Sequence, residues 1–379
     1  MSDPTPQPDR RPVLDRALQE FLDAGAGRPA PDRPDLSFLL RAGAAEGGPP
    51  TVGPPGDGPF AGGAFADGPY GSGLFTDGPF ADGPFADGPF AGGPFGEGGE
   101  DPEDPCGTTS EWLALPCGPT GRVHVQVTRP VGAAVPSPVV LFLPGLGWSL
   151  GDADCYARLV REFALGTDAA VVYVDYARAP GARYPVAVEQ CHAVAGWIRA
   201  HGHQIGLTGR RMAAVGDSAG ANLVAALTLL ARERGDEPLA HQVLLYPVTD
   251  ADFDTASYRR FATGYFLHRE HMRRFWDDYL PDADRRTEAT AAPLRASLEQ
   301  LAGLPPALVV TAEADVLRDE GEAYAARLRA AGVPVVSMRY QGAVHGFLLL
   351  DAVCPTATAR AALVQAVDTV HVALHGGAW

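Results

Sequence analysis

The feature that most limits how this chain can fold is the five-residue segment 216–220, which reads Gly-Asp-Ser-Ala-Gly. A strand-like apolar run over residues 211–215 leads into it, and a helix-like run over residues 221–227 leads out. A strand, a sharp turn with a serine at its tip and a helix make a nucleophile elbow, in which glycines keep side chains out of the turn. A chance match in a glycine-rich chain is the alternative, which the flanking strand and helix disfavour. The pattern predicts that Ser218 stands exposed at the carboxyl edge of a sheet, at a helix N-terminus.

From about residue 110, strand-like and helix-like runs alternate. The predicted strands are 122–128, 139–143, 169–174, 213–215, 243–246, 308–310 and 335–340, and the predicted helices are about 153–165, 187–201, 219–234, 320–331 and 356–373. Continuous apolar strands separated by helices indicate an α/β fold, with a mostly parallel sheet covered by helices on both faces. The alternating apolar and polar residues of 122–128 predict an edge strand. Residues 251–300 break the rhythm and predict a cap insertion, with a helix over 268–280.

The N-terminal part of the chain divides into two segments. Residues 1–46 hold an amphipathic helical pattern over 13–23 and a short apolar stretch over 36–40, which predict either part of the cap or an interaction segment. Residues 47–105 are a Gly/Pro/Phe repeat in which an aromatic residue recurs at every fifth position, from 60 to 95. This composition predicts a disordered linker, and its phenylalanines are either weak stickers or a neutral repeat. Residues 106–379 remain as the catalytic domain.

Charge and composition exclude several kinds of function. Residues 1–105 carry 12 of the 16 net negative charges, so the folded part is near neutral and nothing predicts a nucleic-acid partner. All 30 basic residues are arginine, which excludes lysine nucleophiles and P-loop lysines. The chain shows neither a signal peptide nor an apolar run of membrane-spanning length. Its five cysteines have no metal-ligand spacing. We therefore expect a cytoplasmic protein with reduced thiols and no metal.

A serine nucleophile needs a base and an acid, and on this kind of fold they follow the serine in the order acid, then histidine. Asp315 lies just beyond the predicted strand at 307–311, and His345 lies in a glycine-containing loop after the last strand. We predict the catalytic residues Ser218, Asp315 and His345, with the imidazole as the base and the carboxylate as its orienting partner. The weaker candidates are Asp319 and Glu313 for the acid, and His192, His201, His203, His268, His271, His371 and His375 for the base.

The loop after strand 139–143 reads Pro-Gly-Leu-Gly-Trp over residues 144–148. Here the chain resembles the hormone-sensitive-lipase branch of the α/β hydrolases, and in particular bacterial acetyl esterases. Further motifs that look like the family are Asp175-Tyr-Ala-Arg-Ala-Pro180, Tyr246-Pro-Val-Thr-Asp250, Asp315-Val-Leu-Arg-Asp-Glu-Gly321 and His345-Gly-Phe347, so that the resemblance covers about residues 110–350. It implies an oxyanion hole made by the backbone N–H groups of Leu146, Gly147 and Ala219.

The same loop departs from the family pattern, which is His-Gly-Gly-Gly followed by Trp or Phe. Pro144 stands at the position of the histidine that supports the loop in the family, and Leu146 stands at the middle glycine. If this position needs a positive φ, leucine would strain the loop; its side chain would also narrow the acyl side of the pocket. We also predict that Trp148 and Asp217 contact the substrate.

These observations predict a serine hydrolase that cleaves carboxylic esters or acetyl groups of small molecules through an acyl-serine intermediate. No cofactor is required, and we expect a monomer or a homodimer. The first alternative is an amide deacetylase of an acetylated natural product, because the same three residues serve both reactions. The second is a non-catalytic ligand-binding or scaffold protein on the same fold. Plant hormone receptors that resemble this branch have lost the histidine, whereas His345 is present here.

Overall fold

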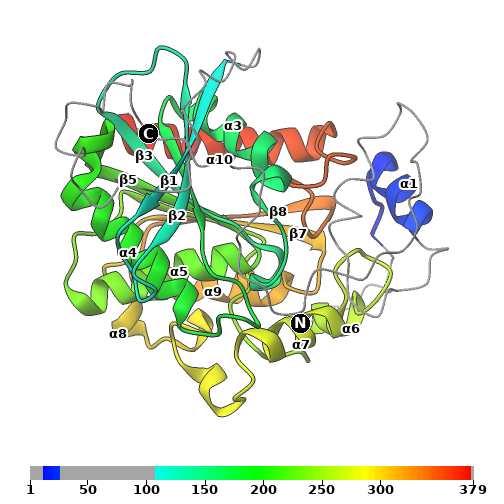
Figure 1. The fold of residues 1–379 in the computed structure, drawn as a ribbon. Helices are drawn as coiled ribbons and strands as arrows, with labels where there is room; N and C mark the ends of the chain where they lie inside the picture. Colours follow the sequence, from blue (N-terminus) through cyan, green and yellow to red (C-terminus); the bar gives the residue numbers. More distant parts are fainter. Residues whose placement is uncertain (1–11, 26–106, 377–379) are drawn as a thin grey trace, which may run out of the picture.

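The computed structural model describes residues 12–25 and 107–376 (Figure 1). Their centre is an eight-stranded sheet in the order β1-β2-β4-β3-β5-β6-β7-β8. The strands are β1 (Thr108–Leu115), β2 (Val123–Pro130), β3 (Ser137–Leu143), β4 (Ala170–Asp175), β5 (Leu207–Asp217), β6 (His241–Leu245), β7 (Ala307–Ala314) and β8 (Val335–Val344). The pairs β1–β2 and β2–β4 are antiparallel, and the other neighbours are parallel. The predicted mostly parallel sheet is confirmed.

Helices cover both faces of this sheet. The helices are α1 (Arg16–Gly25), α3 (Ala153–Thr167), α4 (Val186–His201), α5 (Ala219–Arg234), α6 (Ala256–Arg260), α7 (Arg269–Tyr279), α8 (Leu298–Leu301), α9 (Arg318–Ala330) and α10 (Ala357–His375), and the short 3₁₀ helices are η1 (Leu146–Trp148), η2 (Gly202–Ile205), η3 (Asp284–Thr287) and η4 (Pro293–Arg295). Helices α3 and α10 lie on one face and α4, α5 and α9 on the other (Figure 1). The helices expected between the strands therefore agree with those observed to within about two residues at most ends.

The order of strands at one edge differs from the prediction. Residues 122–128 were expected to form an edge strand, but β2 lies between β1 and β4, and β1 is the edge. Alternation shows that one face of a strand is more exposed than the other, and it does not show whether the strand has a neighbour on both sides. The burial of β2 alternates over its first residues in this way. The prediction of a strand at residues 122–128 is confirmed, and the prediction that it lies at the edge of the sheet is wrong.

The core of the molecule lies where the sheet meets its helices. In β3 the residues from Val139 to Leu143 are fully buried, as a strand covered on both faces must be. Helix α5 is buried on all sides from Ala219 to Ala231, and only its last three residues are exposed, so this part is not amphipathic. This helix begins directly after Ser218. The best-packed helix of the fold therefore fixes the position of the elbow.

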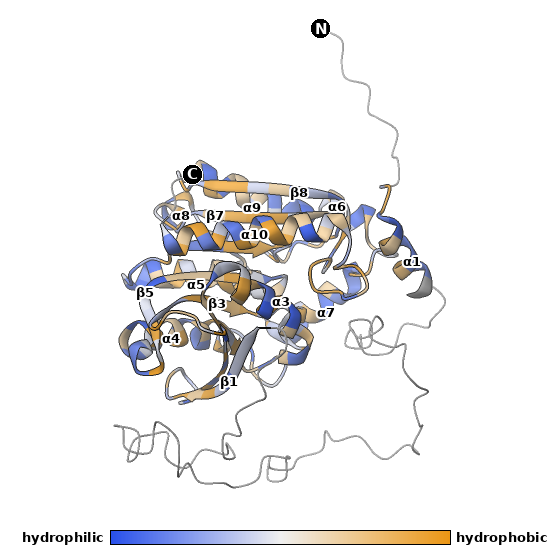
Figure 2. Ribbon diagram, turned by 90° about the horizontal axis from the view of Figure 1, so that it is seen from above, coloured by the Kyte–Doolittle hydropathy of each residue, from blue (hydrophilic) through white to orange (hydrophobic). Residues whose placement is uncertain are grey.

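Residues 251–300, here called the cap, lie between β6 and β7 and contain α6, α7, η3, η4 and the start of α8. The helix expected over 268–280 is α7, and it lies with α6 beyond one end of the sheet (Figure 1). Helix α1 lies next to this region, with the Phe21 and Phe266 rings 6.0 Å apart. Figure 2, which colours the same fold by hydropathy, shows apolar residues along β7 and mixed colours along β8 and α1. The stretch 36–40 and the repeat at 47–105 lie outside the described residues. Within the described ranges, no helix is both long and apolar enough to cross a membrane.

Candidate active site

Ser218 occupies the tip of the turn between β5 and α5, with φ 53° and ψ −119°. Its N–H donates to the carbonyl oxygen of Leu245 at 2.8 Å. The two flanking glycines are required sterically. A Cβ at Gly220 would collide with the carbonyl oxygen of Leu143, and a Cβ at Gly216 would lie 2.5 Å from the backbone of Gly220. The strained conformation of a single serine is thus enforced by close packing of β3, β5 and α5.

The three side chains predicted for catalysis lie together at the carboxyl edge of the sheet. His345 Nε2 is 2.9 Å from Ser218 Oγ, and His345 Nδ1 is 2.8 Å from Asp315 Oδ2. The other oxygen of Asp315 accepts the N–H of Leu317 at 3.0 Å, which fixes the carboxylate. With Nδ1–H donated to the carboxylate, Nε2 is free to accept the serine proton. The arrangement can therefore activate a hydroxyl as a nucleophile.

Ser218 is less accessible than expected. Its exposed fraction is 6%, equal to that of His345, whereas the sequence predicted an exposed hydroxyl. The imidazole lies directly against the hydroxyl, and the ring of Tyr246 packs edge-on against the imidazole at 4.9 Å. The elbow does project from the sheet edge, but neighbouring side chains cover it. A site shielded from water strengthens the electrostatic interactions within it.

The competing acids have other partners. Asp319 accepts the N–H of Ser257 at 2.7 Å and pairs with Arg318, so that it ties the cap to α9. Glu313 accepts the N–H of Gly342 at 2.8 Å. Neither carboxylate is bonded to His345.

Several competing histidines also lie elsewhere. His371 and His375 are both on α10 and contact the carbonyl oxygen of Thr167. His268 and His271 stack on each other in the cap, and His192 pairs with Asp236. Among the described residues, no group of three or more His, Cys, Asp or Glu side chains could hold a metal ion.

The loop over residues 144–148, here called the oxyanion loop, has an unusual backbone. Leu146, Gly147 and Trp148 form η1 with φ values of 57°, 65° and 59°. The condition for strain at Leu146 is therefore met, and a non-glycine residue in this region costs about 1–2 kcal/mol. Leu146 and Ala219 open η1 and α5, and the N–H groups at the start of a helix have no partner within it. Such groups can donate to a developing oxyanion.

Three buried side chains form hydrogen bonds with the backbone of the oxyanion loop. The N–H of Gly145 donates to Tyr156 Oη at 2.8 Å and to Asp217 Oδ1 at 2.9 Å. Tyr176 Oη donates to the carbonyl oxygen of Pro144 at 2.7 Å. Asp217 is 2% exposed and binds the loop backbone, and its contact with substrate stays a prediction. Burial raises the pKa of Asp217 to about 6, and nearby His345 acts against that rise.

Trp148, the last residue of the oxyanion loop, is also buried. It is 1% exposed, and its ring lies flat on that of Tyr279 with centroids 4.2 Å apart and planes 2° apart. The ring therefore packs against the cap, and its contact with substrate stays a prediction. The ring is held in place because Trp276 and Tyr279 of α7 both pack against it.

A comparison with known proteins agrees with this geometry. Residues 140–349 match a family model described as alpha/beta hydrolase fold. Esterase LipI of Mycobacterium tuberculosis is 39% identical over 263 residues, which are 69% of this chain and 80% of that protein. The arylesterase of Saccharolobus solfataricus is 35% identical over 254 residues, covering 65% of this chain and 79% of that protein. A thermostable esterase from Pseudomonas putida ECU1011 has a structure with TM-score 0.78 and 36% identity, covering 97% of this chain and 100% of that one.

This chain belongs to the α/β hydrolases. Its place is in the hormone-sensitive-lipase-like branch, and it is a carboxylesterase-type α/β hydrolase. The expected fold and family are confirmed by these matches.

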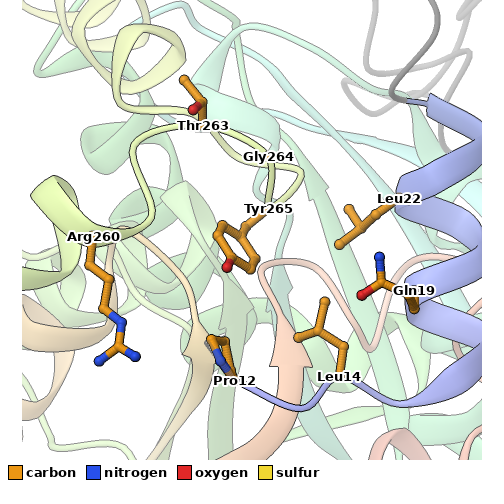
Figure 3. A pocket seen from close by; sticks show the side chains of 8 residues that line it. All are labelled: Pro12, Leu14, Gln19, Leu22, Arg260, Thr263, Gly264 and Tyr265. Atoms are coloured by element: carbon orange, nitrogen blue, oxygen red, sulfur yellow. The ribbon is translucent and has the colours of Figure 1, made fainter. Parts of the chain in front are cut away.

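A cavity of about 510 Å³ lies between the N-terminal segment and the cap of this α/β hydrolase (Figure 3). It is lined by Pro12, Leu14, Gln19, Leu22, Arg260, Thr263, Gly264 and Tyr265. The lining contains no member of the Ser218 site, but the next residue, Phe266, reaches Gly346 beside His345. The N–H of Asp15 donates to the carbonyl oxygen of Gly342 at 3.3 Å. The N-terminal segment is thus a neighbour of the histidine-bearing loop.

Tyr156 and Tyr279 of this α/β hydrolase were not found from the sequence. Both act on the oxyanion loop from positions with no motif of their own, one on α3 and one on α7. Tyr176 lies within the family-like stretch at 175–180, which gave a signal without showing what the side chain contacts. No local pattern shows that a buried tyrosine reaches a distant loop.

Proposed function

We propose that this protein is a serine esterase that cleaves small carboxylic esters, acetyl esters first among them. The observation that supports this most is the continuous contact from Ser218 through His345 to Asp315, at 2.9 and 2.8 Å. These residues lie beside a helix N-terminus and a loop whose N–H groups can donate hydrogen bonds to a negatively charged oxygen. The names of the relatives, esterase and arylesterase, support the same reaction class.

The proposed reaction has two halves. Ser218 Oγ attacks the ester carbonyl while His345 Nε2 takes the hydroxyl proton, and the oxyanion rests on the N–H groups of Leu146, Gly147 and Ala219. The imidazolium then protonates the leaving alcohol, so that an acyl-Ser218 ester remains. Water loses a proton to His345 and attacks this ester, and collapse of the second tetrahedral species returns the proton to Ser218 and releases the acid.

The substrate class rests on a steric argument. Leu146 is 8% exposed and Ser218 is 6% exposed, so that neighbouring side chains cover the nucleophile, which favours a short acyl group such as acetyl. An amide deacetylase remains the second candidate because the same residues would serve it. We further propose a cytoplasmic enzyme that works as a monomer or homodimer without a cofactor.

Labelling with a fluorophosphonate tests the proposal directly. We expect the wild type to be labelled and to hydrolyse p-nitrophenyl acetate, and the Ser218→Ala variant to do neither with its fold retained by circular dichroism. Folded wild type that takes up no label would instead support a ligand-binding or scaffold role. Parallel assays of p-nitrophenyl acetate and p-nitroacetanilide then separate ester from amide preference.

We also propose that residues 1–46 and the insertion at 251–300 form a cap over the site. The contacts of Asp15 with Gly342 and of Phe21 with Phe266 support this. Deleting residues 1–46 is expected to change KM or acyl preference, whereas deleting residues 47–105 with a short flexible link should leave kcat largely unchanged. Unchanged kcat, KM and acyl preference in both deletions would contradict the assignment of residues 1–46 to the cap.

A further inference from the structure

Three aromatic residues of α7, here called the aromatic clamp, cover the oxyanion loop. Tyr279 stacks flat on Trp148, and Trp276 packs edge-on against the same ring at 5.2 Å and 67°. The ring of Phe275 lies so close to Gly147 that a Cβ there would collide with it. All three clamp side chains are 3% exposed or less. Positions three and four apart share one face of a helix, so Phe275, Trp276 and Tyr279 face the loop together.

The oxyanion loop needs such support because its own backbone is unfavourable. Leu146 and Trp148 both lie in the left-handed region, and each costs about 1–2 kcal/mol there. The local hydrogen bonds within the turn are few: the N–H groups of Ser149 and Leu150 donate to the Leu146 oxygen at 3.4 and 3.1 Å, and the Ser149 hydroxyl donates to the Gly147 oxygen at 3.0 Å. An aromatic pair adds about 0.5–1.5 kcal/mol beyond the area it buries. The energy of the aromatic contacts with α7 is therefore large enough to offset the backbone strain.

We propose that the aromatic clamp holds the oxyanion loop in the conformation that presents its N–H groups, so that Phe275, Trp276 and Tyr279 are positioning residues for the reaction. This inference rests on the proposed function, because it concerns the same oxyanion hole. It assigns a second role to the cap, which then sets the rate of the chemical step as well as the shape of the pocket. The donors gain their value in the transition state, so loosening the clamp acts on kcat more than on KM.

Two tyrosines of the chain form a matched pair for the test. Tyr279 on α7 and Tyr324 on α9 are both fully buried, and neither hydroxyl has a hydrogen-bond partner in the described part of the chain. Tyr279→Phe keeps the stacked ring and loses only the idle hydroxyl, so it should retain wild-type kinetics. Tyr279→Leu removes the stack. Tyr324→Leu removes an equally buried ring away from the loop and controls for a general loss of stability.

The measurement is kcat and KM for p-nitrophenyl acetate, with the melting temperature of each variant. We expect Tyr279→Leu to lose about 100-fold in kcat, as when one oxyanion donor is lost, with KM changed by no more than about threefold. Tyr324→Leu should lower the melting temperature comparably and keep its kcat. If Tyr279→Leu does not fold at the assay temperature, Phe275→Leu replaces it with the same expectation.

The two proposals fail in different ways. Wild type that does not hydrolyse the ester, or Ser218→Ala that still does, overturns the proposed function and the clamp with it. An active wild type in which Tyr279→Leu, or Phe275→Leu in its place, has the same kcat as Tyr324→Leu overturns the clamp alone.

Discussion

The elbow at Ser218 and the oxyanion loop at Leu146 both hold a non-glycine residue at positive φ, 53° and 57°, but they are supported differently. At the elbow, Gly216 and Gly220 let β3, β5 and α5 approach until no Cβ fits between them. In the oxyanion loop, leucine and tryptophan occupy positions that suit glycine. Side chains from α3 and β5 bind the Gly145 N–H of this loop, and a ring from α7 stacks on Trp148. The elbow is thus stabilised by backbone packing that its own sequence specifies, whereas the loop depends on distant side chains.

The largest effect should come from the residues around the elbow. Ser218→Ala and His345→Ala are each expected to lower kcat by about 10⁴-fold or more, and Asp315→Asn by about 10⁴-fold because it presents the wrong tautomer of the imidazole. Asp319→Asn should be far milder, since its carboxylate binds Ser257 and Arg318. The check is hydrolysis of p-nitrophenyl acetate at equal folded fraction. A larger loss in Asp319→Asn than in Asp315→Asn would reverse the assignment of the acid.

A glycine substitution tests whether backbone packing supports the elbow. Gly220→Ala places a methyl group against the carbonyl oxygen of Leu143, so we expect a loss of about 3 kcal/mol or more in the free energy of unfolding. Gly196→Ala is the control, because a Cβ at this position in α4 meets nothing within 4 Å. Alanine in a helix interior should stabilise by about 0.5–1 kcal/mol. Equal melting temperatures for the two variants would contradict the steric account of the elbow.

Asp217 joins the two turns, and its titration gives a test that depends on pH. Its folded-state pKa of about 6 lies above the ordinary value of 3.8. The folded protein therefore keeps the proton where the unfolded chain has released it, so the stabilisation is full below about pH 4 and is lost as the pH rises through 6. The loss is on the order of 3 kcal/mol.

Asp217→Asn removes this titration. The free energy of unfolding of the variant relative to that of wild type should therefore be higher at pH 7 than at pH 4, by about 3 kcal/mol. Its kcat should fall by about tenfold, about 1.4 kcal/mol, because the buried charge no longer faces the imidazolium of His345. Denaturant unfolding at the two pH values is the measurement. Parallel stability curves for wild type and Asp217→Asn would show that the carboxyl does not titrate in this range.

The smallest effect is expected at Leu146, where the loop departs from the family pattern. Leu146→Gly should relieve the left-handed strain and open the acyl side of the pocket, at the cost of the contact between the leucine and Gly151. One extra methylene is worth about 1–3 kcal/mol, so selectivity towards propionyl over acetyl esters, which differ by one methylene, should rise by about tenfold. A series of p-nitrophenyl esters measures it. An unchanged acyl-length profile with a large rise in kcat for acetyl would mean that strain, and not pocket width, is what Leu146 contributes.

The sequence by itself determined the parts of this protein that are local or repeated along the chain. The strand, tight turn and helix around Ser218 are specified by neighbouring residues, and the alternation of apolar strands with helices gives a parallel sheet. The carboxyl ends of parallel strands meet at one edge. That is why Asp315 and His345, each just after a strand, could be placed beside Ser218 from their order alone.

The tertiary structure alone decided how the oxyanion loop is held. Gly145 and Asp217 are 72 residues apart, and the ring that stacks on Trp148 comes from α7, more than a hundred residues further along the chain. Such partners leave no periodic or local signal, because each is an ordinary buried tyrosine, aspartate or phenylalanine when read in sequence. The edge position of β1 was missed for the same reason, and the burial of Trp148 and Asp217 has no local signal either. They depend on which segments meet when the chain folds, and packing between distant segments is a property of the whole fold.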